Sequence, residues 1–276
     1  MGKWGRRLAA AGACLAALCA GVFVWVQRSD RFAHTSPGYA CVDLSGPVAR
    51  AEAGRPDYAL LFAQTGLGPP AVDALLRQGR GRELFDFQAQ FFAPCNWSAQ
   101  KGAAMVRLET TETPLRFAPL ETGDILLTSS SRCGGWRNGH AALLVNAEEG
   151  LVLESYSLGW PSQLSSLSTW QDKACVAVLR LKNTPAAARA AIAAAARQNL
   201  LGLPYSLTVG LWGRDKSGFL PSATQCAHLV WCAFAAFGYD LDATPGWPVT
   251  PRDIALCSRL EVVQVYGLPQ GRRWPS

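Results

Sequence analysis

The stretch ATQCAHLVWCAFAAFG, Ala223 to Gly238, places one cysteine at the start of an apolar helix. Apolar residues recur at helical spacing until Gly238, and Ser222 and Thr224 are candidate N-cap residues. Cys226 therefore falls in the first turn, where free backbone N–H groups and the helix dipole favour a thiolate. We take Cys226 as the candidate nucleophile. The alternative is a buried cysteine in the core or in a disulfide, which is common for this residue type.

A cysteine hydrolase also needs an imidazole that holds the proton of the thiol, and a polar group that orients this imidazole. The chain has three histidines, at positions 34, 140 and 228. His34 lies in a polar segment and is set aside. His228 follows Cys226 by two residues, and side chains at i and i+2 of a helix point in different directions. His140 opens the apolar run AALLV after a short turn and is the predicted base, with a core histidine as the alternative.

Four runs rich in Ile, Val and Leu predict short strands of a small antiparallel sheet or barrel, because Gly, Asn or Ser bounds each of them. They are Asp124–Thr128, Ala141–Val145, Leu151–Glu154 and Cys175–Leu181. An alanine-rich helix follows from Thr184 to Gly202, and Thr250 and Pro251 start a last short helix before the closing strand LEVVQVY. The pattern from Tyr58 to Phe92 predicts two or three short helices. The expected fold class is α+β.

Composition divides the 276 residues into four segments. Leu8 to Val26 carries no charge, is about 28 Å long as a helix, and follows several basic residues. Residues 1–27 are therefore predicted to be a membrane anchor or an uncleaved signal, with the N-terminus in the cytoplasm. Residues 28–57 are interpreted as an exported linker, 58–112 as a helical cap region and 113–270 as the main domain.

The net charge of +6 is concentrated near the N-terminus. Residues 1–31 hold five Lys or Arg and one acid, so the rest of the chain carries 21 basic and 19 acidic residues. This near balance gives no argument for nucleic-acid binding.

Nine cysteines are many for a cytosolic enzyme, and seven remain when Cys14 and Cys19 of the anchor are set aside. Seven is an odd number, which predicts three disulfides and one free thiol, Cys226, in an oxidising compartment. The expected pairs are Cys232 with Cys257, Cys41 with Cys95, and, by elimination, Cys133 with Cys175. No CxxC pair is present, so no metal site is predicted.

The motifs GDILLT, NGHAALLV, LVLESYS, GLPYSL and QCAHLVWCAF occur in this order between about Leu120 and Tyr266. Together they resemble the circularly permuted NlpC-type cysteine hydrolases, papain-like enzymes of the YiiX and YaeF kind that are related to the lecithin:retinol acyltransferase family. The resemblance implies an α+β papain-like domain in which a histidine on a strand precedes the cysteine. Carried over by position, His140 is the base and Glu154 the acid on the next strand.

The same resemblance places Asp124 in the opening strand motif and Tyr205 before the nucleophile. We expect both to bind substrate together with the loop residues Trp136 and Trp212. The alternatives are that Asp124 caps a turn, that Tyr205 only packs, and that the tryptophans belong to the core. The sequence departs from the family at Ala227 and His228, where serine and glutamate are usual, and the loop with Cys133, Trp136 and Arg137 has no counterpart.

The resemblance implies a thiol hydrolase that cleaves amide bonds of cell-wall peptides through an acyl-enzyme, without a cofactor or metal. A lipid thioesterase or acyltransferase of the same fold is one alternative, and an inactive binding module of the cell envelope is another. The expected location is the bacterial inner membrane, with a single span and the catalytic domain in the periplasm or outside the cell. The oligomeric state is left open.

Overall fold

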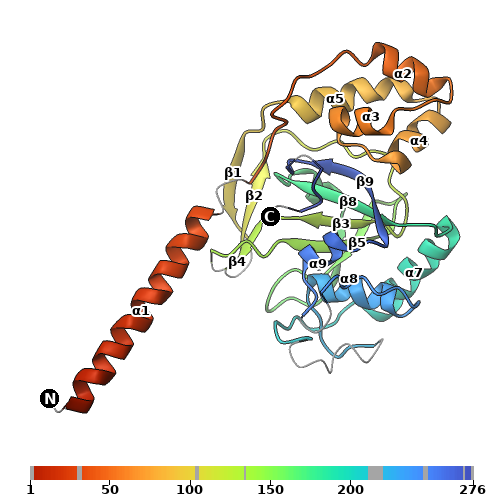
Figure 1. Ribbon diagram of the computed structural model, residues 1–276. Coiled ribbons are helices and arrows are strands. Elements are labelled where there is room, and N and C mark those ends of the chain that lie inside the picture. Colours follow the sequence, from red (N-terminus) through yellow and green to blue (C-terminus); the bar gives the residue numbers. More distant parts are fainter. Residues whose placement is uncertain are drawn as a thin grey trace.

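A six-stranded antiparallel sheet forms the centre of the protein (Figure 1). The computed structural model describes residues 3–29, 33–102, 106–133, 135–210, 220–244, 248–269 and 271–274. The strand order is β7-β6-β5-β3-β8-β9. The strands are β3 (Ile125–Thr128), β5 (His140–Asn146), β6 (Leu151–Glu154), β7 (Gln163–Ser166), β8 (Val176–Leu181) and β9 (Leu260–Tyr266). The predicted α+β class with antiparallel sheets and packed helices is confirmed; the sheet is open, with β7 and β9 at its edges.

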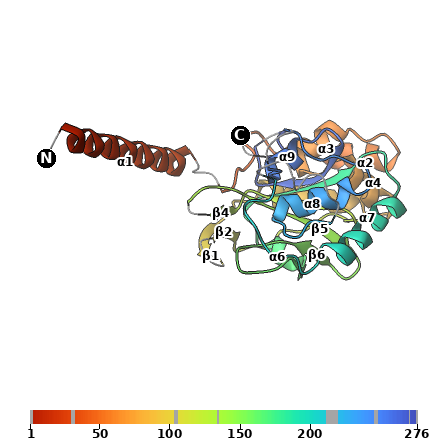
Figure 2. The same ribbon diagram turned by 90° about the horizontal axis from the view of Figure 1, so that it is seen from below.

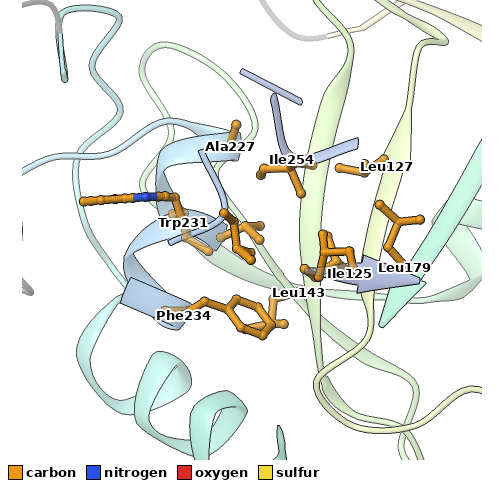
Figure 3. Close-up of a cluster of buried hydrophobic side chains, with 14 of the residues drawn as sticks. Ile125, Leu127, Leu143, Leu179, Ala227, Trp231, Phe234 and Ile254 are labelled. Atoms are coloured by element: carbon orange, nitrogen blue, oxygen red, sulfur yellow. The ribbon is translucent and has the colours of Figure 1, made fainter. Parts of the chain in front are cut away.

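One face of the sheet is covered by α7 (Ala186–Asn199), α8 (Cys226–Ala235) and α9 (Pro251–Leu256). Alternate strand residues such as Ile125, Leu127 and Leu143 point to this face. They belong to the same core as Ala227 and Phe234 of α8, and Figure 3 shows these side chains together. The apolar stripe of α8 is therefore buried on the sheet, and the start of the helix is held at a fixed place beside the strand ends.

The opposite face carries a second group of helices, which lies above the sheet in Figure 1. These are α2 (Ser45–Glu52), α3 (Tyr58–Thr65), α4 (Pro69–Arg77), the 3-10 turn η1 (Gly81–Glu83) and α5 (Leu84–Phe92). Leu126, Leu144 and Val178 point to this face and belong to the same core as Leu75 and Phe87. Because both faces are covered, the central strands are buried along their whole length, which explains why they read as continuous apolar runs.

Beside the main sheet lies a three-stranded sheet of order β1-β2-β4, which the sequence patterns did not predict as a unit. It consists of β1 (Trp97–Lys101), β2 (Val106–Thr111) and β4 (Ser131–Cys133), and the short helix α6 (Ser168–Gln171) completes the described elements. β4 pairs with β2 immediately before the turn that leads into β5. The loop in front of His140 is therefore anchored on this small sheet.

The start and the capping of the local elements agree with the sequence in most places. Cys226 lies in the first turn of α8 as predicted, but the predicted N-caps Ser222 and Thr224 are wrong. The N-cap is Gln225, whose side chain accepts a hydrogen bond from the Ala227 N–H at 2.8 Å. Thr250 and Asp253 form a capping box at the start of α9. The helix α7 starts later than predicted, with Pro185 at its N-cap position.

The segment interpreted as a linker packs against the domain over much of its length. The Thr35 N–H donates to the Gly267 carbonyl at 2.9 Å, and the Gln88 side chain donates to the Val42 carbonyl at 2.8 Å. Leu44 and Val48 are buried in the core of the α2–α5 layer. Most of residues 33–57 is thus part of the folded body.

Helix α1 (Lys3–Ser29) stands clear of the rest of the chain in both views (Figures 1 and 2). Within the part of the chain that the structure describes, no helix is long and apolar enough to cross a membrane. The anchor expected over residues 1–27 therefore gains no support from the structure.

The three predicted disulfides are wrong, because all nine cysteines are free. Helices α8 and α9 do pack together, but their sulfurs face different partners. Cys232 Sγ lies 3.6 Å from a ring nitrogen of His228, and Cys257 Sγ lies 3.8 Å from the Asp240 carbonyl oxygen. Cys175 contacts the Ser129 hydroxyl at 2.8 Å rather than Cys133. No bond between Cys41 and Cys95 connects residues 40–42 to the helices. The connection is made by hydrogen bonds between the Gln64 and Gln88 side chains and the backbone of residues 40–42.

Asp124 is a structural residue and not a substrate ligand. Its carboxylate is fully buried and accepts two hydrogen bonds from Arg180, at 2.7 and 2.8 Å. Arg180 also pairs with Glu121, which in turn binds Arg189 of α7. This network connects the turn before β3 to β8 and to α7. Asp124 therefore serves to hold these elements together, and this is the role that its position in the opening strand motif has here.

We expect Asp124→Ala to lower the free energy of unfolding by about 3 kcal/mol or more, because it leaves the buried Arg180 partly unpaired. Urea denaturation of the full chain measures this change. Asp86→Ala is the matched control: Asp86 is mostly exposed and pairs with Arg116 at the surface, so its loss should cost less than about 1 kcal/mol. Equal losses in the two variants would contradict a structural role of the Asp124 pair.

Candidate active site

Cys226 is the first residue of α8 and lies at the wall of a cavity of about 360 Å³. Its side chain is 6% exposed, so it is sheltered but borders this open space. The Gln225 side chain caps the helix, accepts from the Cys226 thiol at 3.4 Å and donates to the Val249 carbonyl at 2.7 Å. These contacts hold the first turn of the helix, and with it the sulfur, beside the cavity.

His140 and Glu154 come from neighbouring strands and form a hydrogen-bonded pair. Ala142 is the cross-strand partner of Glu154, so His140, two residues before Ala142, lies diagonally beside Glu154 on the same face. His140 Nε2 lies 2.7 Å from Glu154 Oε2. The imidazole also lies close enough to Cys226 for the sulfur to raise the pKa of His140.

Aromatic rings fix the plane of the His140 imidazole. Trp170 stacks on it, with ring centroids 5.5 Å apart and an interplanar angle of 20°. Tyr156 meets it edge-on, with centroids 5.6 Å apart. Since Trp170 is itself fully buried in the core, the imidazole cannot turn away from Cys226 and Glu154 without a rearrangement of the core.

The carboxylate of Glu154 is supported from behind. The Ser165 hydroxyl donates to its second oxygen, Oε1, and the buried Lys173 contributes a positive charge. Burial alone would raise the pKa of Glu154, but the hydrogen bond and charge of His140 outweigh it and lower this pKa. Glu154 is thus held ionised, as a group that orients an imidazolium must be.

The same interactions favour a protonated His140. Burial lowers its pKa, but the hydrogen bonds to Cys226 and Glu154 and their negative charges raise it to about 9. The environment therefore favours an imidazolium beside the Glu154 carboxylate and near the Cys226 sulfur. A charged imidazole next to a cysteine is the arrangement that activates the sulfur as a nucleophile.

We expect His140 to stay protonated up to about pH 9, and His34 to titrate below 6.5 because burial lowers its pKa. The raised pKa of His140 stabilises the fold fully below pH 6.5, and this contribution is lost as the pH rises through about 9. A nitrogen NMR titration of the three imidazoles measures both values. In Glu154→Gln the pKa of His140 should fall; an unchanged value would contradict the pairing.

Of the predicted substrate ligands, the structure places Trp136 and Tyr205 at the cavity. Trp136 is 63% exposed at its rim. Tyr205 forms an isolated β-bridge with Thr224, which lies two residues before Cys226. Burial, together with the nearby Cys226, raises the pKa of the Tyr205 phenol, which therefore stays neutral. Trp212 lies outside the described residues. Asp124 does not line this cavity.

Comparisons with known proteins add little to this geometry. No family model and no curated protein matches the sequence. One solved structure is similar in fold: the crystal structure of the metalloprotein YiiX (DUF1105) from Escherichia coli O157:H7. The two share 17% sequence identity over 57% of this chain and 99% of that one, with a TM-score of 0.40. At this identity and TM-score no function passes from YiiX to this protein. Among the described residues, no group of three or more His, Cys, Asp or Glu side chains could hold a metal ion.

Two residues at the site, Lys173 and Trp274, follow from no pattern in the sequence. Trp274, near the C-terminus, lines the cavity and lies against Gly139, where a Cβ atom would come 2.3 Å from its ring. Gly139 has a φ of +69°, so the turn before His140 needs glycine for two reasons. The signal for the turn was present in the sequence, but nothing in it pointed to Trp274.

His228, which follows Cys226 by two residues, does not line the cavity. It is buried, contacts the Thr224 hydroxyl at 3.1 Å and stacks on Trp231. His228 is thus a core residue of α8.

Proposed function

We propose that this protein is a thiol hydrolase in which Cys226 attacks an amide carbonyl and His140 moves the proton. The observation that carries the proposal is the position of the His140 ring, which is hydrogen-bonded to Glu154 and lies close enough to Cys226 for the two groups to influence each other. A buried histidine that only stabilised a core would not need a carboxylate, a thiol at a helix start and an adjoining cavity together.

In the proposed reaction the Cys226 thiolate attacks the substrate carbonyl while His140 holds the proton of the thiol. His140 then gives this proton to the leaving amine as the C–N bond breaks, which leaves a thioester on Cys226. The neutral imidazole next accepts a proton from a water molecule, which attacks the thioester and releases the acid and the thiolate. Glu154 stays ionised throughout and orients the ring.

The negative charge on the carbonyl oxygen requires hydrogen-bond donors at the start of α8. The Ala227 N–H is already bonded to Gln225. The Cys226 N–H has no acceptor among the described residues, and it lies at the positive end of the helix dipole. We assign it as one donor, and the neutral Tyr205 hydroxyl, which lies near Cys226, as the second.

An amide is the proposed bond, and its cleavage needs a general acid because an amine is a poor leaving group unless it is protonated. The raised pKa of His140 keeps the general acid charged across the neutral range. Peptides of the bacterial cell wall are the proposed substrate class, and a location outside the cytoplasm is part of the proposal; both rest on the sequence resemblance and on the uncharged run at residues 8–26.

A lipid thioesterase or acyltransferase is the second candidate function. The observation that favours it is the apolar rim of the cavity, where Trp136 and Leu207 expose most of their side chains. Such a rim would hold an acyl chain as well as a peptide.

Incubation of the full chain with muropeptides and, separately, with lipid esters tests both candidates. Intact-protein mass spectrometry should detect an acyl group on Cys226 and a shortened muropeptide. An acyl-enzyme with lipid esters alone would favour the second candidate. If Cys226 itself reacts neither with substrate nor with iodoacetamide, the protein is a binding module and the hydrolase proposal is wrong.

A further inference from the structure

A second cavity of about 530 Å³ adjoins the one that holds Cys226. The two cavities share Arg252 and Trp274 in their walls, so they are neighbouring parts of one surface depression. The second cavity lies between α9, the end of β8 and the C-terminal residues 271–274. A substrate bound at Cys226 can therefore reach into it.

The residues that line this second cavity are strongly basic. Lys182, Arg252, Arg272 and Arg273 all border it. No aspartate or glutamate lines either cavity among the residues that the structure describes, and none of these four cations has a carboxylate within 4.0 Å there. Beyond residue 31 the chain has 21 basic and 19 acidic residues, so this separation of charge is local to the depression.

The four cations fall into two pairs. Lys182 donates to the Ser258 carbonyl at 2.8 Å and Arg273 to the Leu260 carbonyl at 2.9 Å, so both help to hold the loop after α9. The side chains of Arg252 and Arg272 are exposed and make no hydrogen bond to another described residue. Their guanidinium groups remain available for a ligand.

We propose that the basic cavity binds an anionic group, a carboxylate or a phosphate, on the substrate whose carbonyl reaches Cys226. The inference rests on the proposed function and adds a specificity site to it. A planar guanidinium offers two parallel donors that match either anion. A depression lined by one sign of charge also raises the local concentration of an anionic ligand and its rate of association.

A pair of thiol reagents tests the site without requiring turnover. N-ethylmaleimide is neutral, and 3-maleimidopropionate carries a carboxylate several bonds from the carbon that the thiol attacks. Rates of modification of Cys226 in the full chain are measured for both by peptide mapping. We expect the ratio of the rate with 3-maleimidopropionate to the rate with N-ethylmaleimide to fall about tenfold or more in Arg252→Gln/Arg272→Gln. In the wild-type protein the same ratio should fall as salt rises from 0.1 to 1 M, because at 1 M salt screens charges over about 3 Å.

Arg197→Gln is the matched control, since it removes an exposed arginine that lines neither cavity. It should leave the ratio unchanged. Protection of Cys226 from 3-maleimidopropionate by inorganic phosphate or by acetate, at equal ionic strength, shows whether the site prefers phosphate or carboxylate.

The anion site is overturned if the Arg252 and Arg272 substitutions leave the rate ratio unchanged. It is also overturned if 3-maleimidopropionate reacts no faster with the wild-type protein than with the doubly substituted protein. The two proposals fail separately. Substrate turnover without an arginine-dependent ratio contradicts only the anion site. An arginine-dependent ratio without turnover of any ester or amide contradicts only the hydrolase.

Discussion

Cys226→Ala should abolish turnover and leave the fold intact. The substitution removes the only atom that forms the covalent intermediate, and loss of the nucleophile in comparable enzymes lowers kcat by about 10⁶-fold. The helix start does not depend on the sulfur, because the Gln225 side chain supplies the cap. We therefore expect a change in the free energy of unfolding of about 1 kcal/mol or less. Turnover of the substrate identified by mass spectrometry and a urea titration measure the two quantities.

Cys232→Ala provides the matched control, because this cysteine lies on the same helix and is equally sheltered. Its sulfur faces His228 and not the cavity, so the variant should keep most of its turnover and lose some stability. A Cys226→Ala protein with near wild-type turnover would end the assignment of the nucleophile.

His140→Ala should lower kcat at least about a hundredfold, which is the usual scale for loss of a general base. The substitution removes both the proton acceptor for Cys226 and the group that Glu154 orients. It also leaves a space between Trp170 and Tyr156, so some loss of stability is expected. For this reason kcat is measured at a temperature at which circular dichroism shows the variant to be folded.

His228→Ala separates the catalytic role from proximity in the sequence. His228 is only two residues from Cys226, but its ring is buried between Thr224, Trp231 and Cys232. Its loss should lower the melting temperature and change kcat far less than His140→Ala does. The reverse order of the two effects on kcat would refute the assignment of His140 as the base.

Much of the local structure could be predicted from the sequence. The place of Cys226 in the first turn of α8, the start of α9 at Thr250 and Pro251, and the strands β3, β5, β6, β8 and β9 follow from patterns within a few residues. The choice of His140 over His228 followed from helix geometry. Its proposed partner Glu154 came from the resemblance, and the structure places the two side chains in contact. The predictions of the elements were confirmed because capping, periodicity and side-chain direction depend on neighbouring residues. The catalytic roles of His140 and Glu154 stay predictions.

The predicted disulfides were wrong because cysteine pairing does not depend on neighbouring residues. Counting cysteines assumes that an even set forms pairs, but pairing requires two sulfurs to face each other at a short distance. Cys232 lies on α8 and Cys257 directly follows α9, and although these helices pack together the two sulfurs contact different partners. Their direction depends on the rotation of each helix against the sheet, which no spacing in the sequence encodes.

The sequence by itself therefore determined the elements and the candidate nucleophile and base, whereas the tertiary structure decided what surrounds them. Trp170 of α6 stacks on His140 of β5 although 30 positions separate them, and Trp274 covers Gly139 although 135 positions separate them. Asp124 pairs with Arg180 because β3 and β8 are neighbours in the sheet. Each of these contacts depends on strand order and on the packing of distant segments, and a local pattern carries no information about either.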